Sequence, residues 1–267
     1  RRVAFGLTAA IMIVMIAGAI NEDSGSASIS VLEEQSTTKY ANPTVAITSI
    51  AADSYINEDE ADNNGFTVVG SSTNTAGECS SANCVVTTTV GGVSRTATVG
   101  NDGSFTVTYA AAAVAGVADG TIAVTADVSN DDGAATQSVA FAILDTADPV
   151  VSQTTAVVTP NNDNTPNVII TSGEAGSLSY ATCTFGSATA GTIVASTATT
   201  LTLDSNGAGG SLSDASYASC KIRVTDAAGN IGSVTLSTFV IDTTVATPSE
   251  TTAVTALAND ATPDVVI

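Results

Sequence analysis

Short segments of this sequence recur at one fixed spacing, and this repeat constrains the fold more than any other feature. The recurring pairs are Leu144–Thr146 with Ile241–Thr243, Thr154–Val157 with Thr251–Val254, and residues 162–170 with residues 259–267. A fixed period is typical of tandem structural units. The last copy holds only one expected strand, which cannot bury its own apolar face. We therefore expect either further chain after it or a packing partner for residues 253–267.

Apolar or alternating runs separated by turn residues predict β-strands throughout both units. In the first unit the predicted strands are residues 44–50, 66–72, 84–90, 93–99, 104–110, 121–128 and 138–145. In the second unit they are residues 167–172, 178–185, 192–198, 200–205, 220–226 and 233–242. Gly91-Gly92 and Asp102-Gly103 predict hairpin turns, because the common two-residue hairpin turns need positive φ.

Composition indicates how these strands pack. Aromatic residues make up 4% of the chain and Trp is absent, so the cores must consist mainly of small β-branched residues. Such cores, with frequent turns, favour thin antiparallel sandwiches. We predict a mainly β fold, with tandem antiparallel β-sandwiches preceded by a hydrophobic α-helix. The predicted boundaries are 1–40 for the helix and linker, 43–145 and 146–242 for the sandwiches, and 243–267 for a linker and the first strand of a further repeat.

The N-terminal stretch Val3–Ile20 is apolar except for Thr8. As a helix it would be about 27 Å long, close to the ~30 Å hydrocarbon core of a bilayer. It is apolar on all faces, so it needs lipid or other helices all round. Three interpretations stay open: a secretory signal peptide ending near Ala17–Ala19, a membrane anchor, and a helix packed against copies of itself, for which its small residues are suited.

Charge and the missing histidine exclude several classes of function. The net charge is −20 and the chain has no histidine. Nucleic-acid binding needs a basic surface, so we expect no nucleic-acid partner. The absence of histidine removes Ser-His-Asp and Cys-His catalysis and the usual zinc sites. No Gly-rich phosphate loop lies between a strand and a helix, so we predict that the protein is not an enzyme.

Several motifs carry a resemblance to a known family. The first unit contains PTVAITSIAADSYINEDEAD at residues 43–62, and the second contains DAAGN at Asp226–Asn230 and IDTT at Ile241–Thr244. Residues 43–242 resemble the bacterial-type Ig-like repeats of long surface adhesins and other cell-envelope proteins. The resemblance implies Ig-like sandwiches. It leaves function open, because such modules serve as stalks, spacers, adhesins and coat subunits.

The N-terminal helix resembles, in architecture, that of type IV pilin and archaellin-type filament subunits, which pack an apolar helix in the core and a β-domain outside. The departures are that no glutamate lies near the start of the apolar stretch and that Arg1-Arg2 precede it. The resemblance implies an extracellular structural subunit of a surface filament, with an adhesive role also open. Its partners would be other copies, joined as a homopolymer through this helix, and the membrane before assembly.

Two other functions stay open beside the filament subunit. The main alternative is a membrane-anchored cell-surface adhesin or surface-layer protein with an Ig-like stalk. A secreted enzyme with Ig-like spacers is the more remote alternative.

The four cysteines suit an oxidising exterior. In the resembling repeats the positions of Cys183 and Cys220 pair and link two strands; the alternative is two buried free thiols. Cys79 and Cys84 are separated by four residues, a spacing that fits a disulfide closing a hairpin tip. Zinc is disfavoured because the four cysteines fall in different units.

Acidic residues crowd the segment Asp53–Asp62, and the resembling repeats often bind calcium near domain junctions. Carboxylates at high local density are what a hard cation needs. The candidate ligands are Asp53, Glu58, Asp59, Glu60 and Asp62, with Asp145 and Asp148 at the junction between the units. The alternative is a solvated acidic loop. Asp226–Asn230 predicts a turn with positive φ at Gly229, with metal binding as the less favoured alternative.

Overall fold

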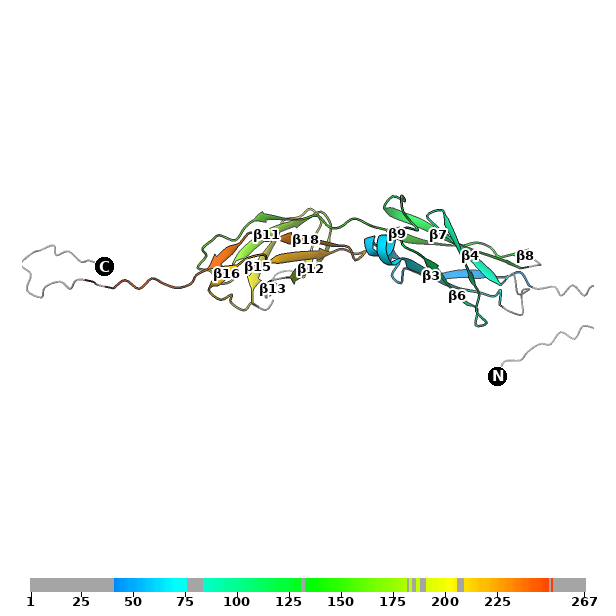
Figure 1. Cartoon of the computed structure of the whole chain (residues 1–267), viewed down its shortest axis with the longest axis horizontal. Coiled ribbons are helices and arrows are strands. Elements are labelled where there is room, and N and C mark those ends of the chain that lie inside the picture. The colour runs from blue at the N-terminus through cyan, green and yellow to red at the C-terminus, as the bar shows by residue number, and fades with distance from the viewer. Residues whose placement is uncertain are drawn as a thin grey trace, which may run out of the picture. The chain divides into compact units, whose positions relative to one another are not determined.

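The computed structural model describes residues 41–75, 84–130, 133–181, 183, 186–187, 191–205, 209–249 and 251. Within these residues the chain is mainly β, as predicted, and its strands form two sandwiches, each with its own apolar core. Figure 1 shows the strands of each sandwich in two layers. The predicted helix at residues 3–20 and the predicted strand at residues 259–267 lie outside the described residues. No helix in the described part is long and apolar enough to span a bilayer.

The first sandwich pairs a sheet of order β1-β3-β6 with a sheet of order β2-β9-β7-β4-β5, to which β8 adds at the end of β7. Its strands are β1 Val45–Ile50, β2 Tyr55–Ile56, β3 Phe66–Ser72, β4 Val85–Val90, β5 Val93–Thr98, β6 Ser104–Tyr109, β7 Gly120–Asn130, β8 Gly133–Ala134 and β9 Ser138–Leu144. A short π-helix, η1 Glu60–Asn64, follows β2. The strand order β1-β3-β6 opposite β9-β7-β4 matches strands A-B-E opposite G-F-C of an immunoglobulin-type sandwich.

Alternation along the strands builds the first core. Phe105, Val107 and Tyr109 of β6 are buried, while the Ser and Thr residues between them are exposed, because successive side chains of a strand point to opposite faces. The Tyr109 ring stacks on Phe66 with ring centroids 5.0 Å apart. Its hydroxyl lies 2.9 Å from the hydroxyl of buried Thr88. The tyrosine therefore fills the core and gives a buried polar group a partner.

The second sandwich repeats this arrangement with sheets of order β10-β11-β15-β13 and β14-β12-β17-β18, and a separate pair, β16-β19. Its strands are β10 Val151–Thr155, β11 Asn167–Ser172, β12 Gly176–Ala181, β13 Gly186–Ser187, β14 Thr192–Ile193, β15 Thr199–Asp204, β16 Ala215–Tyr217, β17 Lys221–Thr225, β18 Ile231–Thr235 and β19 Phe239–Ile241. Ile222 and Val224 of β17 are fully buried, and Tyr217 stacks on Phe239. Among the described residues, the cores of both sandwiches therefore combine small aliphatic residues with a stacked aromatic pair.

One predicted hairpin is wrong. Gly91 and Gly92 have φ of 55° and 83° and join the paired strands β4 and β5, as predicted. Gly103 also has positive φ, 83°, but its turn joins β5 to β6, which belong to different sheets. The carbonyl of Gly103 accepts a hydrogen bond from Ser72 N, so this turn carries the chain across to β3.

Two predicted strands are shorter or interrupted, and one pairing is parallel. The strand predicted at 192–198 ends at Ile193, because Ser196 has positive φ and donates its N–H to Ser172 O. The strand predicted at 233–242 breaks between β18 and β19, where Gln153 Oε1 accepts from Ser237 N. In the first sandwich, β2 pairs with β9 in parallel, so the sheets are not antiparallel throughout.

Candidate metal centre at the junction of the sandwiches

Asn230 of the second sandwich holds the junction together. Its side-chain oxygen accepts from Glu58 N at 2.9 Å, and its Nδ2 donates to the backbone oxygen of Asp145 at 2.8 Å. The residue is 5% exposed, so these bonds are shielded from water. A second bond crosses the junction close by, from Asn57 Nδ2 to Ala228 O at 3.0 Å. The two sandwiches are thus joined by hydrogen bonds as well as by the linker.

The turn at Asp226–Asn230 presents Asn230 to the junction. Asp226 Oδ1 accepts from Gly229 N at 2.7 Å and from Asn230 N at 2.9 Å, and Gly229 has φ of 98°. An Asp side chain that bonds its own backbone and a Gly with positive φ are what a tight turn needs. The predicted turn is therefore present, and it orients both a carboxylate and an amide towards the linker.

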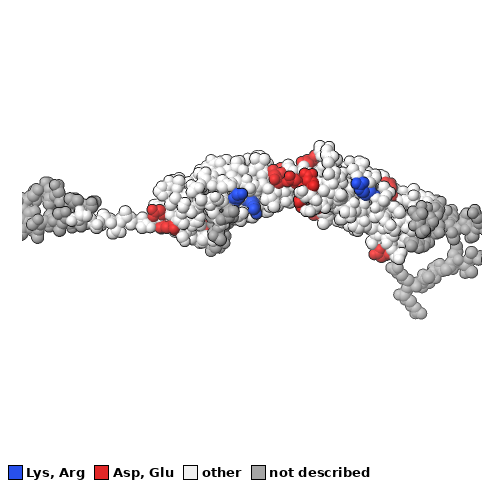
Figure 2. Space-filling view, viewed as in Figure 1, with Lys and Arg blue, Asp and Glu red and all other residues white. Residues whose placement is uncertain are grey.

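Three carboxylates meet beside this turn. Asp145, Glu174 and Asp226 each have an oxygen that lies within 4.8 Å of the other two, and all three side chains are half-buried. We call these three residues the junction cluster. Figure 2 shows acidic side chains gathered around the linker. Asp145 ends the first sandwich, Glu174 lies in the turn between β11 and β12, and Asp226 follows β17.

The junction cluster is electrostatically unfavourable for the carboxylate of Glu174. Burial raises the pKa of Glu174, and the charges of Asp145 and Asp226 and a hydrogen bond to Asp226 raise it further. Asp119 adds to the same effect. Desolvation and like charges both disfavour an ionised carboxylate. A bound cation would reverse both effects, because it replaces lost solvation and neutralises the repulsion.

The residues present fit a hard divalent cation. The junction cluster offers only oxygen donors, and calcium takes six to eight oxygens from carboxylates, carbonyls and water. Three carboxylates could supply part of that number, with water or backbone carbonyls completing it. Asp226 Oδ2 is also held by Asn230 Nδ2 at 3.0 Å, which fixes the orientation of that carboxylate. Asp145, Glu174 and Asp226 are therefore the residues that would hold the cation.

The structure separates the seven acidic residues that the sequence nominated. Only Asp145 belongs to the junction cluster. Glu58, Asp59 and Asp148 line a neighbouring hollow of about 240 Å³ together with Asn57 and the residues 229–231. Asp148 Oδ1 also accepts from Ile231 N at 3.1 Å, so it fastens the linker to β18.

The other three nominated residues have local roles or lie elsewhere. Asp53 Oδ1 accepts from Tyr55 N at 2.9 Å. Glu60 Oε2 accepts from Asn57 N while Asn57 Oδ1 accepts from Glu60 N, a reciprocal pair of hydrogen bonds that joins η1 to the residue three positions before it. Burial raises the pKa of Glu60, with smaller contributions from neighbouring Asp53 and Asp59. Exposed Asp62 lines a separate small hollow with Leu144 and Thr146.

Sequence reasoning missed Glu174 as a candidate ligand and gave Asp226 mainly a turn role. No spacing motif could have found Glu174, because it joins Asp226 through the fold and not through the sequence. A usable signal existed for Asp226, since the DAAGN turn is the most distinctive motif of the second unit. The internal repeat did not identify Glu174 either, because the repeat compares one unit with the next and the cluster forms where two units meet.

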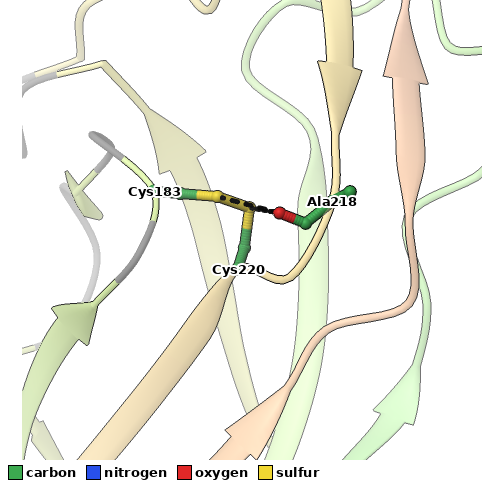
Figure 3. Close-up of a disulfide and its surroundings, with 3 residues drawn as sticks. All are labelled: Cys183, Ala218 and Cys220. Atoms are coloured by element: carbon green, nitrogen blue, oxygen red, sulfur yellow. Dashed lines mark hydrogen bonds between the residues drawn. A yellow bond between two sulfur atoms is a disulfide. The ribbon is translucent and has the colours of Figure 1, made fainter.

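The disulfide Cys183–Cys220 is formed, with Cα atoms 5.0 Å apart. Figure 3 shows it at the ends of β12 and β17, which are neighbours in one sheet, so it ties two strands of the same layer. The carbonyl oxygen of Ala218 lies 3.9 Å from both sulfur atoms. Cys84 is buried and disulfide-bonded. Its predicted partner Cys79 lies outside the described residues.

No family model and no curated protein matches the chain. Several solved structures are similar to it. One is described as "Structural insight into host cell surface retention of a 1.5-MDa bacterial ice-binding adhesin", with 19% identity, a TM-score of 0.42, and coverage of 77% of this chain and 67% of that chain. A second is described as "Ca2+-stabilized adhesin helps an Antarctic bacterium reach out and bind ice", with 20% identity, a TM-score of 0.40, and coverage of 76% of this chain and 50% of that chain.

A third is a bacterial immunoglobulin-like domain from the M. primoryensis ice-binding adhesin, with 26% identity and a TM-score of 0.27. It covers 41% of this chain and 100% of that chain. Of the second structure, the ice-binding adhesin described as Ca2+-stabilized, the present chain spans about half the length.

Proposed function

We propose that this chain is an Ig-like stalk segment of a cell-surface adhesin-type protein, with a divalent cation bound at the junction of its two sandwiches. The observation that carries the proposal is the junction itself. Asn230 bonds both the first sandwich, through Glu58 N, and the linker, through Asp145 O. Hydrogen bonds across the linker suit repeats that must transmit tension or hold a fixed spacing.

The chemistry of the chain supports a binding or spacing role over catalysis. The sequence has no histidine and a net charge of −20. The carboxylates with raised pKa, Glu174 and Glu60, lie at the junction and at the start of η1. The disulfide between Cys183 and Cys220 suits an extracellular location, where thiols stay oxidised.

The cation has a definite task in this proposal. Asp145 belongs to the linker end of the first sandwich, while Glu174 and Asp226 belong to the second. A cation shared by all three would add a bond across the junction and offset the burial and the repulsion that raise the pKa of Glu174. Calcium fits the oxygen-only donor set and is abundant outside cells, where sites bind it at about 10⁻⁴–10⁻³ M.

In the filament-subunit function, copies of the chain form a homopolymer through residues 3–20, and the sandwiches face outward. Its support comes from the apolar sequence of that stretch alone. The adhesin-type stalk is the better supported of the two, because it rests on the described junction and on the resemblance of residues 43–242.

Labelling of intact cells that express the chain tests the proposal. An antibody against the second sandwich, followed by immunogold electron microscopy, should label the outside of cells that have not been permeabilised. Label found only after permeabilisation would contradict a surface stalk. Electron microscopy of sheared material separates the two surface functions, since regular fibres containing the chain would favour the filament subunit.

A further inference from the structure

The end of the second sandwich from which the chain leaves has the same backbone bonds as the corresponding end of the first sandwich. Asp242 N donates to Asn161 O at 2.9 Å, and Asp145 N donates to Ile56 O at 3.0 Å. In both sandwiches the segment that provides this carbonyl pairs in parallel with the last strand. We call residues 56–58 and 145–147 the exit end of the first sandwich, and residues 161–163 and 242–244 the exit end of the second.

A carboxylate fastens the departing chain at both exit ends. Asp214 Oδ1 accepts from Thr243 N at 3.0 Å and from Thr243 Oγ1 at 2.8 Å. Asp119 Oδ1 accepts from Thr146 N at 3.2 Å and from Thr146 Oγ1 at 3.0 Å. The two exit ends therefore hold the chain in the same way as it leaves each sandwich.

The exit end of the first sandwich is covered, and its partner shows what an exit end binds. Asn230 accepts from Glu58 N at 2.9 Å and donates to Asp145 O at 2.8 Å. Asn57 Nδ2 donates to Ala228 O at 3.0 Å. The exit end thus contributes a backbone N–H, a backbone carbonyl and an amide side chain, and all of their partners lie in one turn of the second sandwich.

The exit end of the second sandwich has the same three groups. Asn162 and Asp163 follow the parallel bridge to the last strand just as Asn57 and Glu58 do, and Asp242 supplies the carbonyl. All three of these residues of the second sandwich are exposed. The groups that bind a neighbouring unit at the first exit end are therefore present at the surface of the second.

One of these groups has a substitute partner in this structure. Asp163 N donates to Asn161 Oδ1 at 2.9 Å. The first sandwich has Ile56 at that place, and its Glu58 N bonds the amide oxygen of Asn230. The second sandwich therefore supplies from its own loop an amide oxygen of the kind that the first sandwich takes from its neighbour. A docked asparagine would take over this position.

The turns that face a preceding unit differ between the two sandwiches. Asp226 Oδ1 accepts from the N–H three residues further on at 2.7 Å, and Asn230 follows. In the first sandwich, Asn130 Oδ1 accepts from the N–H three residues further on at 3.1 Å, and Ala134 follows. We call residues 226–230 and residues 130–134 the entry turns. Only the entry turn of the second sandwich ends in the asparagine that bonds an exit end.

We propose that the exit end of the second sandwich docks a further Ig-like unit, and that it selects a unit whose entry turn ends in asparagine over one whose entry turn ends in alanine. The asparagine accepts from Asp163 N and donates to Asp242 O. Alanine makes neither bond and leaves the carbonyl of Asp242 unpaired in the contact, which costs free energy. Selection of this kind comes from the polar groups that the wrong partner leaves unpaired. This docking extends the stalk and so rests on the proposed function.

The described sandwiches of a second copy do not offer the required partner. Among the described residues, the entry turn that ends in Asn230 is already covered by the first sandwich of its own chain, through Glu58 and Asp145. The other entry turn ends in Ala134. The fitting partner is therefore a unit that resembles the second sandwich and has an uncovered entry turn.

The test builds this partner into the full chain, held in a mild detergent with its disulfides oxidised. Residues 146–242 are repeated after Asp242, so that the added unit brings a copy of Asn230. Nitroxide labels on cysteines introduced at exposed Thr200 and at its copy report the distance between the two units by pulsed electron spin resonance. The distance distribution should be narrow. Alanine at the copied asparagine alone should replace it with a broad one, because two bonds across the new junction are lost.

A second variant and a control pair decide between the outcomes. Asn162→Ala changes an exposed residue outside both cores and should also broaden the distribution. Labels at Thr106 and Thr200 span the existing junction and should give a narrow distribution in every chain. Narrow distributions in both variants would overturn the proposal, because the linker alone would then fix the units. A broad new pair beside a narrow control pair would overturn the docking and leave the proposed function standing, whereas two broad pairs would contradict both.

Discussion

Replacing Asn230 by alanine should uncouple the two sandwiches. The side chain makes three hydrogen bonds, to Glu58 N, to Asp145 O and to Asp226 Oδ2. The first two join the second sandwich to the first sandwich and the linker. A neutral buried hydrogen bond contributes about 1 kcal/mol, so these two bonds together contribute about 2 kcal/mol to the coupling. The third bond, to a carboxylate, adds a further ~2 kcal/mol within the second sandwich.

Amide hydrogen exchange measures the coupling directly, because the Glu58 amide is a donor to Asn230. In the Asn230→Ala chain this amide should exchange about 30-fold faster, the factor that corresponds to about 2 kcal/mol. Asn130→Ala is the matched control. Asn130 lies at the end of β7 in the first sandwich, and its side chain bonds Ala41 O and Gly133 N, away from the junction.

The Asn130→Ala chain should leave the exchange of Glu58 unchanged. Equal exchange of the Glu58 amide in the wild-type and Asn230→Ala chains would refute the reasoning, since the bond would then give no protection.

The same structure makes four further predictions. Serine at both Cys183 and Cys220 should lower the free energy of unfolding of the second sandwich by about 3–4 kcal/mol, measured with denaturant, and unchanged stability would contradict the role of the disulfide. Gly232→Val should cost about 1–3 kcal/mol, because a Cβ there collides with the carbonyl oxygen of Pro149; a melting temperature equal to wild type would be the contrary result. In the absence of divalent cations, stability should fall as the pH rises above 4.5, the ordinary pKa of Glu174 and Glu60, because the raised folded-state pKa of each makes ionisation costly, and Glu174→Gln should reduce that slope. The intact mass should be four hydrogens below that of the reduced chain, and alkylation of all four thiols without reductant would disprove this.

The strands could be predicted because their signals are local. Residues 167–172 form β11 with the predicted bounds, because turn residues mark both ends of this short apolar run. The turn at Gly91-Gly92 was equally predictable from its need for positive φ. By contrast, Asp102-Gly103 has the same local chemistry as a hairpin turn. Whether such a turn stays within one sheet or crosses to the other depends on which strands pair, and that is a property of the fold.

The candidate site could be predicted only in its location. A crowded acidic segment and the junction residue Asp145 pointed to this end of the first sandwich. Glu174 could not be found, because the pairing of β12 with β17, with Ser177 opposite Thr225, brings the turn before β12 beside Asp226 from a distant part of the sequence. Glu60 was nominated for its charge, but its carboxylate accepts a hydrogen bond from Asn57 N. The crowding of acidic residues in the sequence therefore indicated where the junction lies. It did not identify which carboxylates come together there.

Calcium binding measured by isothermal titration calorimetry on the full chain tests the junction cluster most directly. The wild-type chain should bind calcium at the junction, and Glu174→Gln should weaken that binding by about tenfold or more, the factor that corresponds to about 1.4 kcal/mol. Asp62→Asn, which alters a carboxylate outside the cluster, should leave the binding unchanged. Absence of binding to the wild-type chain, or an equal effect of the two substitutions, would contradict a cation held by Asp145, Glu174 and Asp226.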